Sequence, residues 1–293
     1  GGVVPEIACR YHVEYIGYVL KQALLKPGIS LDDIDLVAVT KGPGLVGALL
    51  VGVSLAKSLA LTRNLPLVGV NHLKAHIWAA KMSAANLRLP FVGLVVSGGH
   101  TALIHVKSSD KMKLLGQTRD DAAGEAFDKA AKILKLGFPG GPAIEEAAKK
   151  SRNGCVKFSR PSIDGKSVDF SFSGIKTAVL YHAQALGAKL SAKTPAIAAG
   201  FQEACVDALV EKSVLASSKT KTKRLAVGGG VSANNRLREK LKTACDSEGI
   251  ELHLPPFELC TDNAAMIAAL GYELYKRSKK DTLNLTAEPN LSW

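Results

Sequence analysis

Short apolar runs and longer amphipathic stretches alternate along this chain. Apolar runs bounded by glycine, proline or polar residues predict strands, and apolar residues recurring every three or four positions predict helices. The predicted strands are residues 34–40, 67–70, 91–96, 102–106, 224–227 and 251–254. The predicted helices are residues 42–61, 124–136, 173–186, 195–217 and 263–279, with others beginning near residues 72, 142 and 234. This alternation indicates an α/β fold with largely parallel sheets, and the Gly-Gly turn after residue 96 indicates a hairpin.

Length and composition limit the classes of protein that fit. A chain of 293 residues is long enough for two domains, and we place their boundary near Leu89-Pro90. With 47% apolar and 22% charged residues, the composition is that of a globular protein. The apolar runs are too short to span a bilayer, and the first residues lack the basic and apolar pattern of a signal peptide.

Cysteine usage and charge add two expectations. The cysteines are odd in number, scattered and without CxxC spacing: Cys9, Cys155, Cys205, Cys245 and Cys260. This usage indicates a reducing compartment, with neither a disulfide framework nor a cysteine metal site. The net charge of +12, from 38 basic and 26 acidic residues, suggests an anionic partner. Nucleic acid and a merely basic surface are both compatible with that charge.

A histidine pair is the strongest candidate for chemistry. His72 and His76 are four residues apart, so on a helix both imidazoles project from the same face and can bind one metal ion. Zinc or iron would then need a carboxylate from elsewhere in the chain. A metalloprotease would have a glutamate after the first histidine as general base, but Leu73 occupies that position. Two histidines that merely pack on a helix are the alternative.

Three glycine-rich turns suggest a nucleotide-like ligand. They lie at strand or helix ends, where backbone N–H groups approach anions closely: residues 97–100, 138–142 and 228–235. Two acidic groups accompany them. Asp120 and Asp121 precede a predicted helix, where interaction with the helix dipole is a sufficient explanation. Asp262 precedes the last helix, either as its N-cap or as the carboxylate that the histidine pair lacks.

Eight short motifs occur in one order along the whole chain. They are Gly1-Gly-Val-Val-Pro-Glu6, His72-x-x-x-His76, Ser97-Gly-Gly-His-Thr101, Asp121-Ala-Ala-Gly-Glu-Ala-Phe-Asp-Lys129, Pro139-Gly-Gly-Pro142, Phe170-Ser-Phe-Ser-Gly174 with Lys176-Thr177, Gly229-Gly-Val231 with Asn234, and Cys260-Thr-Asp-Asn-Ala-Ala-Met266. In these motifs the chain resembles the tRNA N6-adenosine threonylcarbamoyltransferase family, once described as O-sialoglycoprotein endopeptidases. The Pro-Gly-Gly-Pro and Cys-Thr-Asp-Asn forms resemble its bacterial and mitochondrial branch.

The resemblance implies an actin-like (ASKHA) α/β fold with the ligand in a cleft between two domains. Residues 1–89 would form the first domain, with helix 263–279 packed back on it, and residues 90–293 the second domain together with that helix. The implied reaction moves a threonylcarbamoyl group from threonylcarbamoyl-AMP to N6 of the adenosine 3′-adjacent to the anticodon of tRNA. Family members carry a strand pair before the first motif, so the resemblance implies a shortened chain with an exposed sheet edge.

Carried over residue by residue, the resemblance also implies a site. One divalent metal ion, iron or zinc, would be bound by His72, His76 and Asp262, and no further catalytic residue is assigned. The adenylate would be held by Val95, Val96, Ser97, Gly98, Gly99, Asp128, Gly141, Glu145 and Asn234. A metalloprotease-like hydrolase lacks its general base here. An ATP-dependent kinase of the same superfold would have no use for the histidine pair.

The resemblance implies macromolecular partners as well. Besides tRNA, they are a paralogous actin-like subunit and a small P-loop ATPase. A homodimer is compatible with the sequence, no membrane association is expected, and the location would be cytoplasmic or, alternatively, mitochondrial. Three basic clusters are candidates for tRNA phosphate contacts: Lys219, Lys221, Lys223 and Arg224; Lys149, Lys150 and Arg152; and Lys276, Arg277, Lys279 and Lys280. Ordinary solvated surface is the alternative for each cluster.

Overall fold

A computed structural model describes residues 4–84, 86–151, 154–159 and 166–293. Contacts group the chain into two compact units. The first comprises Gly1–Trp78 and Asn263–Trp293, and the second comprises Ala79–Asp262. Such units are not necessarily independently folding domains, so the boundary near Leu89-Pro90 stays a prediction.

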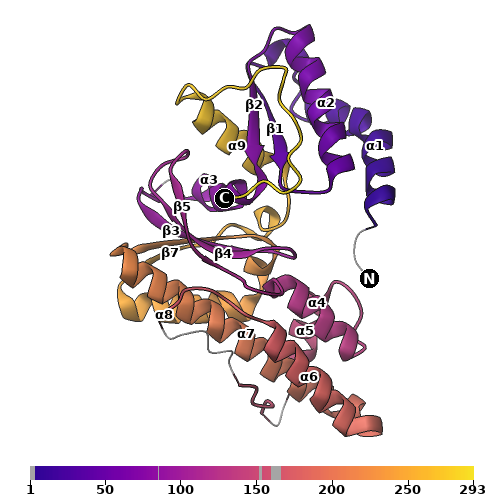
Figure 1. The fold of residues 1–293 in the computed structure, drawn as a ribbon, viewed down its shortest axis with the longest axis vertical. Coiled ribbons are helices and arrows are strands. Elements are labelled where there is room, and N and C mark those ends of the chain that lie inside the picture. Colours follow the sequence, from indigo (N-terminus) through magenta and orange to yellow (C-terminus); the bar gives the residue numbers. More distant parts are fainter. Residues whose placement is uncertain (1–3, 85, 152–153, 160–165) are drawn as a thin grey trace. The chain divides into compact units, whose positions relative to one another are not determined.

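The first unit is a small parallel sheet between helices. Its elements in chain order are α1 (Pro5–Leu25), η1 (Leu31–Asp33), β1 (Val37–Gly42), α2 (Val46–Thr62), β2 (Leu67–Asn71) and α9 (Ala264–Tyr275). β1 and β2 pair in parallel because α2 provides the crossover between them. Within this unit, α2 covers one face of the sheet, α9 covers the other, and α1 packs on the outside of α2 (Figure 1).

Small residues let the layers of this unit approach closely. A Cβ added at Gly271 of α9 would lie 2.5 Å from the Cβ of Ala38 in β1. The core between α2 and the sheet consists of aliphatic side chains: Val53, Ala56, Ala60, Leu67 and Leu285. The helix α3 (His72–Ser83) follows β2 without an intervening loop, and the division between the two units falls within it.

The second unit is built on a five-stranded sheet of order β5-β4-β3-β6-β7. Its strands are β3 (Phe91–Val96), β4 (Thr101–Val106), β5 (Met112–Gln117), β6 (Arg224–Gly228) and β7 (Glu251–His253). β3, β4 and β5 form an antiparallel meander, whereas β6 pairs in parallel with β3 and β7. The expected hairpin is confirmed, but the expectation of largely parallel sheets is wrong for this unit. Short turns connect β3, β4 and β5, and such turns can join only antiparallel neighbours.

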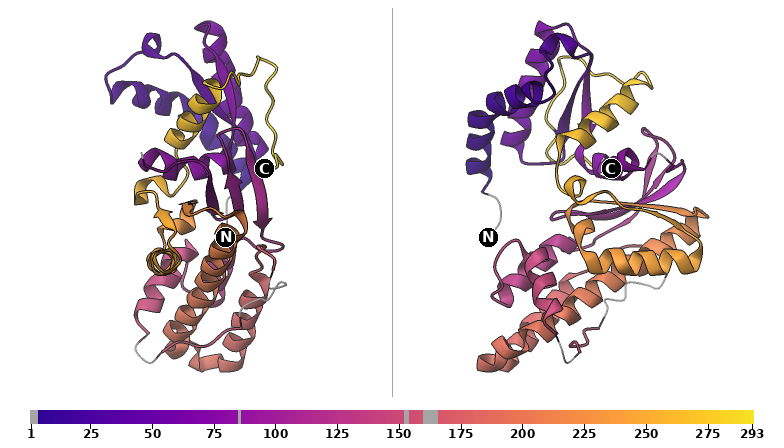
Figure 2. Two further views of the ribbon diagram at one scale, coloured as in Figure 1. Left: turned by 90° about the vertical axis from the view of Figure 1, so that its left-hand side faces the viewer. Right: turned by 180° about the vertical axis from the view of Figure 1, so that it is seen from behind.

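Helices cover this sheet and enclose the main core. They are α4 (Ala123–Ile133), α5 (Gly140–Lys149), α6 (Ser173–Leu186), η2 (Gly187–Lys189), α7 (Leu190–Thr220), η3 (Gly230–Ala233), α8 (Asn235–Glu248) and η4 (Phe257–Leu259). The long helix α7 and the shorter α8 lie against one face of the sheet (Figures 1 and 2). Fully buried aromatic side chains such as Phe127 and Phe201 fill the space between α4 and α7, with their rings edge to face.

Candidate functional site

Asn71 fixes where the histidine helix begins. Its side-chain Oδ1 accepts hydrogen bonds from the N–H groups of Leu73 (2.9 Å) and Lys74 (3.1 Å), the arrangement of an N-cap. Its Nδ2 donates to the carbonyl of Ser292 (3.0 Å), which ties the cap to the C-terminal segment. Since β2 ends at Asn71, His72 is the first residue of α3 and stands at the end of a buried strand.

The two imidazoles lie together on one side of α3, as their spacing predicts. The ring centroids of His72 and His76 are 4.7 Å apart, with an angle of 72° between the ring planes. His76 is buried and His72 is half-buried. Leu73 is 2% exposed and packs in the core, so the position where a metalloprotease would have its general base is an apolar anchor of the helix.

Asp262 joins this pair. One ligand atom each of His72, His76 and Asp262 lies within 4.8 Å of the other two, and among the described residues this is the group of His, Cys, Asp and Glu that offers three metal ligands together. Asp262 directly precedes Asn263, whose Oδ1 accepts from the N–H of Met266 (2.9 Å) and caps α9. The N-cap explanation for Asp262 is therefore wrong, because Asn263 has that role.

The donor set fits a divalent metal. Two neutral imidazoles and one carboxylate suit zinc or iron, and three protein ligands leave a coordination position for a substrate oxygen. Two lysines lie near the start of α3. Burial, together with repulsion from Lys41, lowers the pKa of Lys74 below its ordinary value, and Lys41 itself pairs with Glu288 (3.0 Å).

The turn between β3 and β4 is tight and exposes two glycines. The N–H of Ser97 donates to the carbonyl of His100 (2.8 Å), and the N–H of His100 donates to the Ser97 hydroxyl (3.2 Å). A Cβ added at Gly98 or Gly99 would meet nothing within 4 Å. The backbone at these two glycines is therefore accessible to a ligand.

Other glycines of the site are enclosed by the neighbouring turns. A Cβ added at Gly124, at the start of α4, would lie 2.7 Å from Gly98 Cα and from the Ser97 carbonyl oxygen. A Cβ at Gly140 would overlap the backbone of Asp128, and one at Gly229 would overlap the backbone of Val96. The 228–235 turn therefore packs against the end of β3, and the 97–100 and 138–142 turns each pack against α4, all within the second unit.

The residues predicted to hold the adenylate surround these turns in a connected set. Asp128 Oδ1 accepts from the N–H of Gly140 (2.7 Å) at the start of α5. Glu145 of α5 accepts from the Asn235 side chain (2.7 Å) at the start of α8. The preceding residue, Asn234, caps α8 by accepting from the N–H of Leu237 (2.9 Å), and its Nδ2 donates to Gln202 (2.9 Å).

The remaining residues predicted to bind the adenylate differ in which of their atoms a ligand can reach. Val95 and Val96 are fully buried in β3, so only their backbone atoms are available to a ligand. Gly141, like Gly98 and Gly99, has open space where a Cβ would be. The binding roles of all nine residues stay predictions.

Asp120 and Asp121 have roles that the sequence did not indicate. Asp120 Oδ1 accepts from the N–H groups of Phe172 (2.8 Å) and Ser173 (3.2 Å), and Oδ2 from both the Ser171 and Ser173 hydroxyls. Asp120 therefore caps the start of α6, although Ser171 lies 51 residues further along the chain. It does not cap α4, the helix that follows it in sequence. The predicted interaction with the dipole of the next helix therefore does not by itself explain Asp120.

Asp121 connects two helices through lysines. Its carboxylate lies 2.7 Å from Lys129 Nζ on α4 and 2.6 Å from Lys176 Nζ on α6. Burial alone would raise the pKa of Asp121, but the hydrogen bonds from these two lysines lower it below its ordinary value overall. The ionised carboxylate therefore ties α4 to α6 through these two lysines.

The basic clusters are only partly engaged within the chain. Lys219 donates to the carbonyl of Lys166, and Lys223 donates to the carbonyl of Glu248 (2.6 Å). Lys149 and Lys150 lie 3.7 Å and 3.8 Å from the Glu146 carboxylate. Arg152, which completes the second cluster, lies outside the described residues. Lys221 is exposed, and so are the four basic residues at 276–280.

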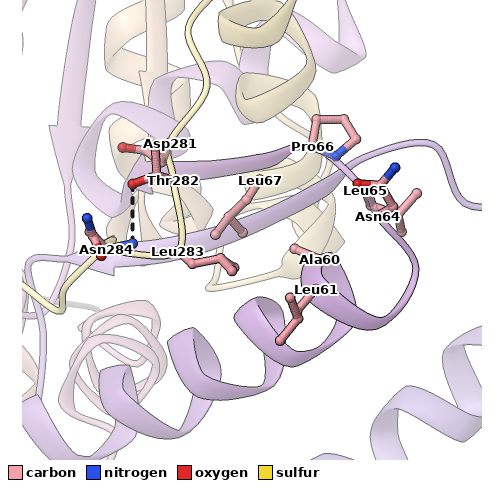
Figure 3. Close-up of a pocket in the computed structure, with 10 residues that line it drawn as sticks. All are labelled: Ala60, Leu61, Asn64, Leu65, Pro66, Leu67, Asp281, Thr282, Leu283 and Asn284. Carbon is pink, nitrogen blue, oxygen red and sulfur yellow. Dashed lines mark hydrogen bonds between the residues drawn. The ribbon is translucent and has the colours of Figure 1, made fainter.

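A pocket of about 480 Å³ lies elsewhere in the first unit (Figure 3). It is formed by the end of α2, the start of β2 and residues 281–284, where the N–H of Asn284 donates to the Thr282 hydroxyl (3.2 Å). None of its ten lining residues belongs to the histidine cluster or the glycine turns. We therefore do not assign the predicted chemistry to it.

No helix in the described part of the chain is both long enough and apolar enough to cross a bilayer. Similarity to solved structures is low in sequence but extensive in fold. T. kodakarensis HypF is 16% identical and superposes with a TM-score of 0.62, over 91% of this chain and 44% of that one. A likeness at this identity shows a shared α/β fold and carries no inference about activity.

Similarity in sequence is much closer. The family model described as TsaD, tRNA N6-adenosine threonylcarbamoyltransferase, matches residues 1–269. The protein of that name from Thermosipho africanus is 48% identical over 99% of this chain and 88% of its own length. The one from Thermosipho melanesiensis is 49% identical over 100% of this chain and 88% of its own length. The chain belongs to the tRNA N6-adenosine threonylcarbamoyltransferase family.

Proposed function

We propose that this protein transfers a threonylcarbamoyl group from threonylcarbamoyl-AMP to N6 of the adenosine 3′-adjacent to the anticodon of tRNA. The observation that supports this most is the family match over residues 1–269, together with relatives of that name about half identical across the whole chain. The presence of both the histidine–carboxylate cluster and the glycine turns agrees with it.

We assign one divalent metal ion, iron or zinc, to His72, His76 and Asp262. When bound there, it would supply a Lewis acid that polarises the carbamoyl carbonyl. The three side chains would orient it: the imidazoles are held by the capped start of α3 and the carboxylate by its place just before α9. Leu73 contributes no proton transfer, because its side chain is apolar and buried.

The glycine turns would hold the adenylate part of the substrate. The accessible backbone at Gly98 and Gly99 suits its phosphate, and Asp128, Gly141, Glu145 and Asn234 suit its nucleoside. In the reaction, the adenosine N6 bonds to the carbamoyl carbon, the bond from that carbon to the phosphate oxygen breaks, and AMP leaves. The N6 nitrogen loses one proton to solvent. Because AMP is a good leaving group, positioning and charge stabilisation can supply the catalysis without a protein nucleophile.

We infer contacts to tRNA phosphates for the exposed basic clusters and cooperation with a paralogous actin-like subunit and a small P-loop ATPase. The net charge of +12 and the exposure of Lys221 and of residues 276–280 support the first inference. Such contacts would position the tRNA, while selection of the adenosine would depend on the site itself.

The direct test is synthesis of the modified nucleoside. The full chain is incubated with synthetic threonylcarbamoyl-AMP and a tRNA transcript that lacks modifications, with the two partner subunits of a bacterial relative added. Digested tRNA is then analysed by mass spectrometry. We expect threonylcarbamoyladenosine with the wild-type chain and none with a His72→Ala, His76→Ala double variant.

A His12→Ala variant is the matched control. His12 is an exposed histidine on α1, and its ring hydrogen-bonds to the Ala8 carbonyl of the same helix. The proposal is wrong if the wild-type chain makes no modified nucleoside under conditions in which the relative's own transferase does.

A further inference from the structure

Arg238 lies on α8, one turn after the predicted adenylate residue Asn234, and its N–H donates to the Asn234 carbonyl (3.1 Å). The guanidinium has three further partners. Nε donates to the carbonyl of Ser232 (2.7 Å), and Nη2 donates to the carbonyl of Pro255 (2.7 Å) and to Cys260 Sγ (3.2 Å). All of these residues belong to the second unit.

The same guanidinium also stacks on an aromatic ring. Its central carbon lies 4.2 Å from the ring centroid of Phe257, in the segment between Pro255 and Cys260. Ser232 and Cys260 are fully buried, and Cys260 Sγ also lies 3.4 Å from the Pro256 carbonyl. One planar side chain therefore holds both the turn that precedes Asn234 and the segment that ends two residues before Asp262.

We propose that Arg238 is a positioning residue that couples the glycine-rich turn at residues 228–235 to Asp262, the carboxylate assigned to the metal. The inference rests on the proposed metal role of Asp262. Arg238 is not one of the proposed metal ligands or of the residues predicted to hold the adenylate. It acts through the Pro255 carbonyl and the Cys260 thiol, which fix the segment that leads to Asp262, and through the Ser232 carbonyl, which fixes where η3 meets α8. Lysine cannot replace Arg238 here. A guanidinium holds several N–H donors in one plane and can bond to separate acceptors at once, whereas a lysine ammonium is a single compact charge.

The test compares Arg238→Met and Arg238→Lys with Arg236→Met. Arg236 is on the same helix and is similarly half-buried, but it pairs with Glu203 (2.5 Å) and Glu239 (2.7 Å). Metal affinity is measured by titrating Zn²⁺ in competition with a chromophoric chelator. Hydrogen exchange of residues 255–262 is measured on the same metal-free proteins, with and without AMP.

We expect both Arg238 variants to bind Zn²⁺ about tenfold or more weakly, as for other residues that orient a ligand without touching the metal. We also expect faster exchange across residues 255–262 and a loss of the protection that AMP gives this segment in the wild type. Arg236→Met should match the wild type in all three readouts. If Arg238→Met does not fold, Arg238→Lys alone decides.

Three outcomes would overturn the inference. Unchanged Zn²⁺ affinity in Arg238→Lys would show that Arg238 does not position the carboxylate, while the metal site itself stands. Equal weakening in Arg236→Met would reduce the effect to general destabilisation of α8. A wild-type chain that binds no Zn²⁺ would remove the metal site and this inference with it, but would leave the adenylate site untouched.

Discussion

The start of α3 and the glycine turns after β3 and β6 in the second unit all follow buried strands, but they offer a ligand different groups. At the start of α3, the N–H groups of Leu73 and Lys74 already donate to the Asn71 side chain. The ligand groups there are the side chains of His72 and His76, which lie together. At the turns, side chains are absent at Gly98 and Gly99, and the backbone itself is accessible. The first region suits a metal ion, and the second suits a phosphate.

Substitutions should affect a site made of side chains and a site made of backbone groups in different ways. A side-chain site is lost when the ligand residues change, with little effect on the fold. A backbone site contains glycines of two kinds: those that let the turns pack, such as Gly124, Gly140 and Gly229, and those that leave room for a ligand, such as Gly98, Gly99 and Gly141. Replacing the first kind should cost stability, and replacing the second kind should cost binding.

The largest effect on stability is expected for Gly229→Ala. Gly229 has a φ of 97°, and an added Cβ would overlap the Val96 backbone. Strained backbone and overpacking together should lower the free energy of unfolding by roughly 3 kcal/mol. Chemical denaturation measures this directly. The neighbouring Gly230 has open space at its Cβ position, so Gly230→Ala should be close to the wild type. Equal losses in the two variants would mean that the packing of the turns is not what requires Gly229.

A smaller effect, on binding instead of stability, is expected for Gly99→Ala. Its Cβ would project into open space, so the free energy of unfolding should stay within about 0.5 kcal/mol of the wild type. Affinity for AMP, measured by calorimetry, should fall about tenfold, the loss expected for one weakened hydrogen bond to a charged group. Gly17→Ala on α1, also in open space, is the control. Wild-type AMP affinity in Gly99→Ala would place the adenylate elsewhere.

The smallest effect is expected for Asp121→Asn and depends on pH. Because the folded-state pKa of Asp121 is lowered, the carboxylate stabilises the fold above its ordinary pKa, near 3.8, and this contribution is lost as the pH falls through the lower folded-state value. Asp121→Asn should therefore destabilise by roughly 1 kcal/mol at pH 7 and by less at pH 3. Asp32→Asn is the control. Because Asp32 and its partner Arg63 are both exposed, this substitution should change the free energy of unfolding little at either pH. A pH-independent loss in Asp121→Asn would rule out the ion pairs as its cause.

Much of the secondary structure follows from the sequence pattern. The predicted strands and helices at residues 67–70, 91–96 and 173–186 differ from the observed ones by at most one residue at either end. Among the described α-helices and strands, α1 and β5 were not predicted. No residue of α1 is buried, and β5 mixes lysine, glycine and glutamine with its apolar residues.

The site could be predicted only as far as local spacing reaches. The histidine pair lies within one helical turn, so its geometry follows from the sequence. The approach of Asp262, 186 residues beyond His76, depends on α9 returning to the sheet formed by β1 and β2. The capping of α6 by Asp120 and the contacts of Arg238 with Pro255 and Cys260 likewise depend on tertiary packing. No sequence spacing encodes such contacts.

Metal content is the most direct measure of the difference between the two regions. The chain and a His72→Ala, His76→Ala double variant are purified in parallel, and bound metal is quantified by elemental analysis, with AMP affinity measured on the same samples. We expect about one metal ion per wild-type chain, none in the double variant, and equal AMP affinity in both. Stoichiometric metal that persists in the double variant would contradict the assignment of His72, His76 and Asp262.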